Sequence, residues 1–202
     1  MTGRVQQASD GLLPAIIDNV CNEQELEQEA SYPAPHFRDR QMMRRALQAA
    51  RQAYARGEVP VGAVVALGDE MLAVAANERE ASQDPTAHAE LLALRRAADK
   101  IGSWRLSGCT LYSTLEPCPM CAGAAHAARI SRLVYAAPDP KAGYAGTLHN
   151  IPTDSRLNHT FPSESGVLGE EAANLLRDFF KERRKTARIR PRTSPEHDET
   201  RL

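Results

Sequence analysis

The pattern of apolar and polar residues predicts a chain of alternating helices and strands. Residues 39–57 carry apolar side chains at helical spacing and end on a glycine, which favours an amphipathic helix. Its apolar stripe consists of Met43, Leu47, Ala50 and Tyr54. Two short apolar runs follow, VGAVVAL and MLAVAAN, and the GDE between them predicts a β-hairpin.

The rest of the pattern adds further strands and helices. The segment DPTAHAELLALRRAADK predicts a helix, with Asp84 or Thr86 as its cap and Pro85 in its first turn. CTLYST and RLVYAA predict strands, and CPMCAGAAHAARI predicts a helix between them. A long loop then leads to a last helix, GEEAANLLRDFFKERRK, whose apolar stripe consists of Ala173, Leu176 and Phe180. This alternation predicts a three-layer α/β/α sandwich, and the hairpin makes its sheet mixed.

Length and charge divide the chain into one domain and two flanks. A chain of 202 residues suits a single domain with tails, and we place the domain at 39–185. Residues 1–38 form an acidic extension that we expect to be poorly ordered, closed by the linker YPAPHF, because two prolines oppose regular structure there. Residues 186–202 are expected to form a disordered, basic and polar tail.

Composition narrows the class of protein. Apolar residues make up 42% of the chain and charged residues 25%, which is typical of a soluble globular protein. No apolar run reaches the roughly 18 residues that cross a membrane, and the N-terminus resembles neither a secretory signal nor a transit peptide. We therefore expect a cytoplasmic protein. Its four cysteines are too few for a disulfide framework.

Three residues have the types and spacing of a zinc site. Cys118 and Cys121 lie three residues apart at a predicted helix start, so both sulfurs lie on one face near the positive end of the helix. His88 lies at another helix start and supplies a third ligand. Three protein ligands leave one tetrahedral position open for water, whose pKa zinc lowers from about 15.7 to about 7.

A carboxylate near the histidine favours catalysis over a structural metal. For a CxxC pair alone, a redox pair or half a structural zinc site is together as good an explanation as a catalytic metal site. Glu90 follows His88 by two residues, and a glutamate beside an activated water can act as general base and then acid. By itself, Glu90 is equally well explained as an exposed helix residue.

The combination of HAE with PCPMC resembles the signature of zinc-dependent deaminases. Further segments resemble the bacterial tRNA-specific adenosine deaminases over about residues 39–185. They are EVPVGAVV, DPTAHAELLALR, TLYSTLEPCPMCAGA, DPKAGYAGT, LNH and LLRDFFKERR. The resemblance implies the five-stranded mixed sheet of the cytidine and deoxycytidylate deaminase superfamily.

The resemblance also implies a reaction and the residues that perform it. His88, Cys118 and Cys121 would hold one Zn²⁺ per subunit, Glu90 would move protons, and Asn77 would hydrogen-bond the base. The enzyme would be a hydrolase of an amidine C–N bond: water attacks C6 of adenine, ammonia leaves, and adenosine becomes inosine. The implied substrate is the wobble adenosine of an arginine tRNA anticodon, and the implied assembly is a homodimer.

Residues of the DPKAGYAGT loop, of the LNH segment and of the final helix would form the tRNA surface by the same resemblance. Asp139 and Lys141 match the loop near the flipped nucleotide, and Asn158 matches another residue on the RNA side. Phe179, Phe180 and Arg183 match the final helix, which contacts the anticodon loop in the family. Lys181, Arg183, Arg184 and Lys185 would neutralise phosphates. We expect Phe180, on the apolar stripe, to lie in the core.

Two other functions remain open at this point. An enzyme acting on free cytosine, guanine or a nucleoside would use the same zinc chemistry, but it has no need of the basic final helix or of the DPKAGYAGT loop. A non-catalytic, zinc-stabilised RNA-binding subunit has no use for Glu90.

Overall fold

The computed structural model describes residues 34–189. Its helices and strands are, in chain order, α2 (Ala34–Ala55), β1 (Gly62–Leu67), β2 (Glu70–Ala76), α3 (Arg79–Ser82), α4 (Ala89–Ile101), β3 (Cys109–Leu115), α5 (Pro119–Ala127), β4 (Arg132–Ala137), β5 (Ser163–Ser165) and α6 (Gly169–Ile189). The predicted extension up to residue 33, with Cys21, and most of the predicted tail lie outside the described residues. Over 34–189, no helix is long and apolar enough to cross a membrane.

The five strands form one mixed sheet in the order β2-β1-β3-β4-β5. Strand β1 pairs antiparallel with β2 and β3, whereas β3, β4 and β5 run parallel. The hairpin turn contains Gly68 at φ 58°, a left-handed conformation that glycine adopts without steric cost. The predicted mixed sheet is therefore confirmed, and its parallel half requires the crossover helix α5 between β3 and β4.

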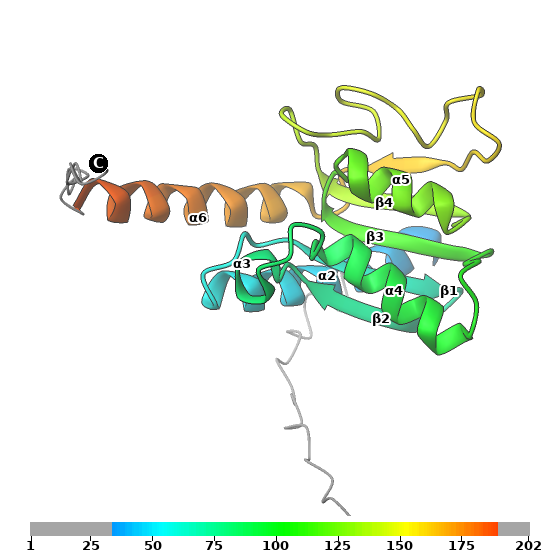
Figure 1. Cartoon of the computed structure of the whole chain (residues 1–202), viewed down its shortest axis with the longest axis horizontal. Helices are drawn as coiled ribbons and strands as arrows, with labels where there is room; N and C mark the ends of the chain where they lie inside the picture. The colour runs from blue at the N-terminus through cyan, green and yellow to red at the C-terminus, as the bar shows by residue number, and fades with distance from the viewer. Residues whose placement is uncertain (1–33, 190–202) are drawn as a thin grey trace, which may run out of the picture. The chain divides into compact units, whose positions relative to one another are not determined.

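Helices cover both faces of the sheet (Figure 1). The three central strands β1, β3 and β4 are therefore buried on both sides. In β1, Val64 and Ala66 pack under α2 and α6, while Ala63 and Val65 pack under α4 and α5. This is why VGAVVAL is a continuous apolar run instead of an alternating one. The core therefore has two halves, one on each face of the sheet.

One glycine sets the distance between a helix and the sheet. A Cβ on Gly62 would overlap the carbonyl oxygen of Ala46 and approach the backbone nitrogen of Ala50 to 2.7 Å. Ala46 and Ala50 belong to the face of α2 that packs on the sheet, and both are fully buried. The missing side chain lets the backbones of α2 and β1 touch.

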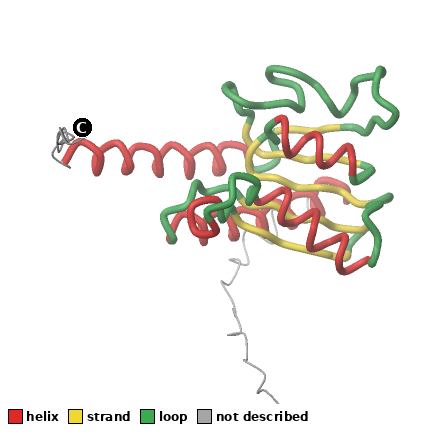
Figure 2. The backbone as a smooth tube through the Cα atoms, in the orientation of Figure 1, coloured by secondary structure: helices red, strands yellow, loops and turns green. Residues whose placement is uncertain are grey.

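Several predicted boundaries were wrong. Helix α2 begins at Ala34 and includes Pro35, because a proline in the first turn removes only an N–H that has no helical partner. Helix α4 begins at Ala89, since the carboxylate of Asp84 accepts bonds from Thr86 and closes a turn instead of capping a helix. Helix α6, one continuous helix in Figure 2, runs past residue 185 to Ile189. Its residues 181–186 are exposed.

The core assignment at the end of α6 was also wrong. Phe180, predicted to be buried, is 44% exposed, whereas Phe179 is 5% exposed. Neighbouring helix positions differ by about 100° in direction, so the buried face of α6 is rotated by one residue from the predicted stripe.

Candidate metal centre and active site

His88, Cys118 and Cys121 form the one cluster of possible metal ligands within residues 34–189. The Nδ1 atom of His88 lies 3.7 Å from the sulfur of Cys118 and 3.6 Å from that of Cys121, and the two sulfurs are 3.6 Å apart. Zinc bonds of about 2.3 Å to sulfur and about 2.0 Å to nitrogen, at tetrahedral angles, separate such atoms by roughly 3.5–3.8 Å. The three donors therefore fit zinc.

Two helix starts bring these ligands together. His88 is the N-cap of α4, and Cys118 is the N-cap of α5, with Pro119 as the first helical residue. Cys121 follows in the first turn of α5, where the 3.6-residue period returns it to the side of Cys118. The side chains at both caps are free of capping hydrogen bonds and are turned to the ligand cluster.

The ligands share protons with one another. The hydrogen bond between the two sulfurs lowers the pKa of Cys118 to about 4 and raises the pKa of Cys121. A hydrogen bond to Cys118 raises the pKa of His88. Zinc binds the thiolate and the neutral imidazole, so metal binding would release the protons that this cluster holds.

Glu90 lies beside the cluster and is buried. Its side chain is 3% exposed, burial raises its pKa to about 7, and its carboxyl interacts with Cys121 by a hydrogen bond. Its Oε2 atom has no hydrogen-bond partner. Glu90 is thus not the exposed helix residue that its spacing from His88 also allowed. A buried carboxyl with one unsatisfied oxygen can hold or release a proton at that atom.

Asn77 follows directly after β2 and is 5% exposed, at the strand end predicted for it. Its Nδ2 donates to Oε2 of Glu58 over 2.9 Å, and its backbone N–H donates to the carbonyl of Val61. The next residue, Glu78, donates its N–H to the carbonyl of Ala87 over 3.0 Å, and Ala87 precedes His88. The end of β2 is therefore tied to the segment that carries a metal ligand.

Glu116 is a residue of this region that the sequence did not single out. It lies between β3 and Cys118, is 1% exposed, and accepts bonds from the backbone N–H groups of Asp139, Ala145 and Thr147 and from the hydroxyl of Thr147. These bonds anchor the loop between β4 and β5 beside the cysteines. The only sequence signal was its place in LEPC, which does not distinguish a buried carboxylate from an exposed one.

The predicted tRNA contacts in this loop lie at its surface. The Oδ1 atom of Asp139 accepts bonds from the backbone N–H groups of Lys141, at 2.9 Å, and Ala142, at 3.2 Å, and so shapes the turn. Lys141 is exposed, and Asn158 is exposed and accepts a 2.7 Å bond from Arg129. Asp139 and Asn158 thus have structural partners as well.

The predicted contacts on α6 dock that helix onto the end of α2. Phe179 packs edge-on against Tyr54 with ring centroids 5.4 Å apart. The Arg183 guanidinium lies 5.7 Å from the Phe179 ring centroid and donates to the carbonyl of Gly57 over 3.5 Å. The buried face of Phe179 is unavailable for stacking, whereas the neighbouring ring of Phe180 is accessible.

Comparison with known proteins gives closely related sequences and structures. Residues 37–184 match the family model for MafB19-like deaminase. The chain is 48% identical over 147 residues to the tRNA-specific adenosine deaminase of Bacillus subtilis (strain 168), covering 73% of this chain and 91% of that protein. It is 47% identical over 152 residues to the Haemophilus influenzae tRNA-specific adenosine deaminase, covering 75% and 88%.

Solved structures agree with this fold. A structure from studies of A-to-I editing by tRNA:A34 deaminases at the wobble position superposes with a TM-score of 0.65 at 41% identity, covering 67% of this chain and 99% of that one. A guanine deaminase from Nitrosomonas europaea superposes with a TM-score of 0.62 at 25% identity, covering 84% and 98%.

Proposed function

Because the chain belongs to the tRNA-specific adenosine deaminases, we propose that it converts adenosine to inosine at the wobble position of a tRNA anticodon, in arginine tRNA. The observation that supports this most directly is the His88–Cys118–Cys121 cluster with the buried carboxyl of Glu90 beside it. A structural zinc site has no need of a carboxyl group with an unsatisfied oxygen.

The chain's own groups supply the proton transfers. When bound, zinc would lower the pKa of a water molecule to about 7. Glu90 would take the proton of that water at Oε2, the oxygen without a partner, and deliver it to the amino nitrogen that leaves as ammonia. Burial favours this role because it stabilises the protonated carboxyl between the two transfers.

Asn77 is proposed to hold the base. It is buried at the end of β2, next to the segment that leads to His88. The wobble base must leave its stack to reach this depth, which costs a few kcal/mol, and less in a loop than in a duplex. A buried amide that pairs with the extruded base would offset part of that cost.

The anticodon loop is proposed to lie across the β4–β5 loop and α6. The contacts would be Asp139, Lys141, Asn158, Phe179 and Arg183, with Phe180 as the more accessible ring beside Phe179. Lys181, Arg184 and Lys185 are exposed on the last turns of α6 and would neutralise phosphates. We further propose that the protein works in the cytoplasm as a homodimer, whose mass can be measured in solution by light scattering.

The test uses an arginine tRNA transcript with adenosine at the wobble position. Incubation with the zinc-loaded protein should give inosine at that base alone, read by sequencing as a change from A to G. A transcript with guanosine at the wobble position is the matched control. Turnover of free guanine or cytosine without inosine in the tRNA would instead assign the protein to the small-molecule deaminases.

A further inference from the structure

A second buried carboxylate, Glu58, supports the residue proposed to hold the base. Glu58 lies just beyond the end of α2 and is 1% exposed. Its Oε2 accepts from Nδ2 of Asn77 over 2.9 Å, and its Oε1 accepts from the backbone N–H of Ala81 over 2.7 Å. Each carboxylate oxygen therefore has one donor, and Glu58 joins the end of α2 to the end of β2 and to α3.

These bonds decide which way the amide of Asn77 points. Glu58 accepts hydrogen bonds and donates none, so the reversed amide would place Oδ1 of Asn77 against a carboxylate oxygen. The nitrogen must face Glu58, which leaves Oδ1 and the second N–H of the amide for another partner. An acceptor and a donor side by side are what an asparagine offers to the N6 and N7 atoms of adenine.

The same edge disfavours a 6-oxo purine. Guanine and hypoxanthine, the base of inosine, carry an acceptor oxygen where adenine carries its amino group, and Oδ1 of Asn77 would face it without a hydrogen bond. A buried polar group that loses its partner costs more than an absent contact. The fixed amide would therefore favour the substrate over the product.

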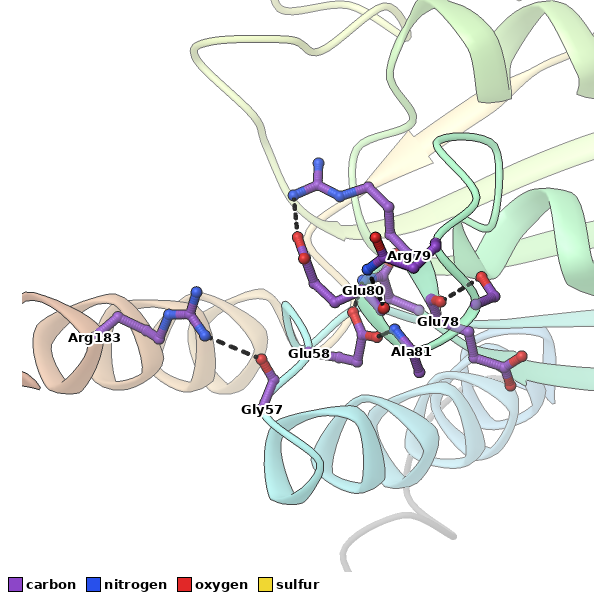
Figure 3. A network of polar contacts seen from close by, with 10 residues as sticks. Gly57, Glu58, Glu78, Arg79, Glu80, Ala81 and Arg183 are labelled. Atoms are coloured by element: carbon purple, nitrogen blue, oxygen red, sulfur yellow. Dashed lines mark hydrogen bonds and ion pairs between the residues drawn. The ribbon is translucent and has the colours of Figure 1, made fainter. Parts of the chain in front are cut away.

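The surroundings hold Glu58 in place. Arg183 on α6 donates to the carbonyl of Gly57, the residue before Glu58, and Ala81 lies in α3 (Figure 3). Gly57 has φ 79°, so the chain turns sharply between α2 and Glu58. Glu58 thus sits where three helices and the hairpin meet.

We infer that Glu58 is a positioning residue of the base pocket, which fixes the Asn77 amide so that the pocket accepts a 6-amino purine and disfavours a 6-oxo purine. The inference rests on the proposed function, because it takes Asn77 to be the residue that contacts the base. It goes beyond that function in assigning a role to Glu58 and a physical reason for release of the inosine product.

The test is a double-mutant cycle on the zinc-loaded protein with the wobble-adenosine tRNA. Glu58→Gln offers one acceptor to two donors, so kcat/KM should fall about 10- to 100-fold. Asn77→Ala should cost at least as much. The double variant should be no worse than Asn77→Ala alone, because Glu58 acts through that amide.

A matched control separates positioning from stability. Asp39 is another carboxylate with 1% exposure, and it accepts bonds from Tyr112 and Arg132 on the α2 face of the sheet. Asp39→Asn should lower the melting temperature. Because Asp39 acts independently of Asn77, the double variant Asp39→Asn/Asn77→Ala should lose kcat/KM by the product of the two single losses. A multiplied loss in the Glu58→Gln/Asn77→Ala protein, with normal zinc content, would overturn the inference.

Two further readouts report on the amide itself. The tRNA with guanosine at the wobble position should bind the wild type more weakly than the tRNA with adenosine does, and so inhibit it weakly. In Glu58→Gln the ratio of the two affinities should shrink at least about threefold, because an amide released from Glu58 can reverse and donate to the 6-oxo group. An unchanged ratio would overturn the inference.

The side-chain amide protons of Asn77, identified by their loss in Asn77→Ala, should exchange slowly in the wild type and faster in Glu58→Gln. This NMR measurement needs no turnover. If the protein had no deaminase activity, the proposed function would be refuted, and the exchange rates would still show whether Glu58 restrains the amide of Asn77. Equal exchange rates in the wild type and in Glu58→Gln would overturn the inference.

Discussion

Two buried carboxyl groups flank the metal-binding cluster, and they differ in what surrounds them. Glu116 accepts four hydrogen bonds, three from backbone N–H groups and one from a hydroxyl. Glu90 is equally buried, yet its Oε2 has no partner. Burial raises the pKa of both, but the hydrogen bonds outweigh it at Glu116, whose pKa is lowered, whereas the pKa of Glu90 rises to about 7. A satisfied carboxylate holds a loop, and an unsatisfied one is available to exchange protons.

The largest effect should come from removing a ligand of the metal site that lies between the two carboxyl groups. Cys121→Ser should lose zinc, because a serine hydroxyl stays protonated where the thiol becomes a thiolate. Turnover should fall to background and the melting temperature should drop, since metal binding stabilises the folded state. Metal analysis and calorimetry of the purified variant measure both. Cys109→Ser is the control, because Cys109 is buried away from the cluster and should retain zinc.

The next effect distinguishes the unsatisfied carboxyl. Glu90→Gln should keep zinc and fold but lower kcat by about 10²- to 10⁴-fold, the usual contribution of a general acid and base. Its melting temperature should stay within a few degrees of the wild type, because Oε2 has no bond to lose. Single-turnover assays and thermal unfolding report the two quantities. Full activity in this variant would remove Glu90 from the proton transfers.

The satisfied carboxylate should show the opposite pattern. Glu116→Gln replaces one acceptor oxygen by an amide donor that faces backbone N–H groups, so we expect a loss of about 2–4 kcal/mol in the free energy of unfolding. Activity should fall less than in Glu90→Gln and should recover as the temperature is lowered. Urea titration gives the stability. A loss of turnover with no loss of stability would contradict the structural role of Glu116.

The smallest effect tests the surface on α6. Neutralising Lys181, Arg184 and Lys185 to glutamine should weaken tRNA binding and lower the slope of log K against log salt by about 2–3, since each of the three phosphate contacts contributes roughly 0.7–0.9. Filter binding at several salt concentrations measures this slope. The control replaces Lys100 and Arg105, at the far end of α4, by glutamine. Equal slopes in both variants would show that the tRNA binds elsewhere.

The sequence predicted the metal ligands of the site, but not the buried carboxylates that hold the surrounding segments in place. Ligand types, spacing and helix starts predicted the convergence of His88, Cys118 and Cys121, because each depends on local structure. The burial of Glu58 and Glu116 depends on segments distant in sequence, such as Asn77 and the β4–β5 loop. A glutamate next to a proline or valine carries no local sign that its carboxylate will be enclosed.

The fold shows the same limit. Apolar periodicity predicted β1 to β4 and the four longer helices, since those patterns reflect burial directly. Strand β5, with the sequence SES, has no apolar residue and forms only because the backbone of β4 is available beside it. The prediction that Phe180 is the buried ring was wrong for a related reason. Where two phenylalanines are adjacent, tertiary packing decides which of them is buried, and here it is Phe179.

The contact between Gly62 and α2 also limits how this protein can be redesigned. Any larger residue at position 62 would push the helix outward, and the turn that follows the helix would carry the Asn77 support with it. Selections for altered base preference should therefore enrich substitutions at Asn77 and Glu58, while Gly62, whose lack of a side chain lets helix and strand touch, should remain glycine.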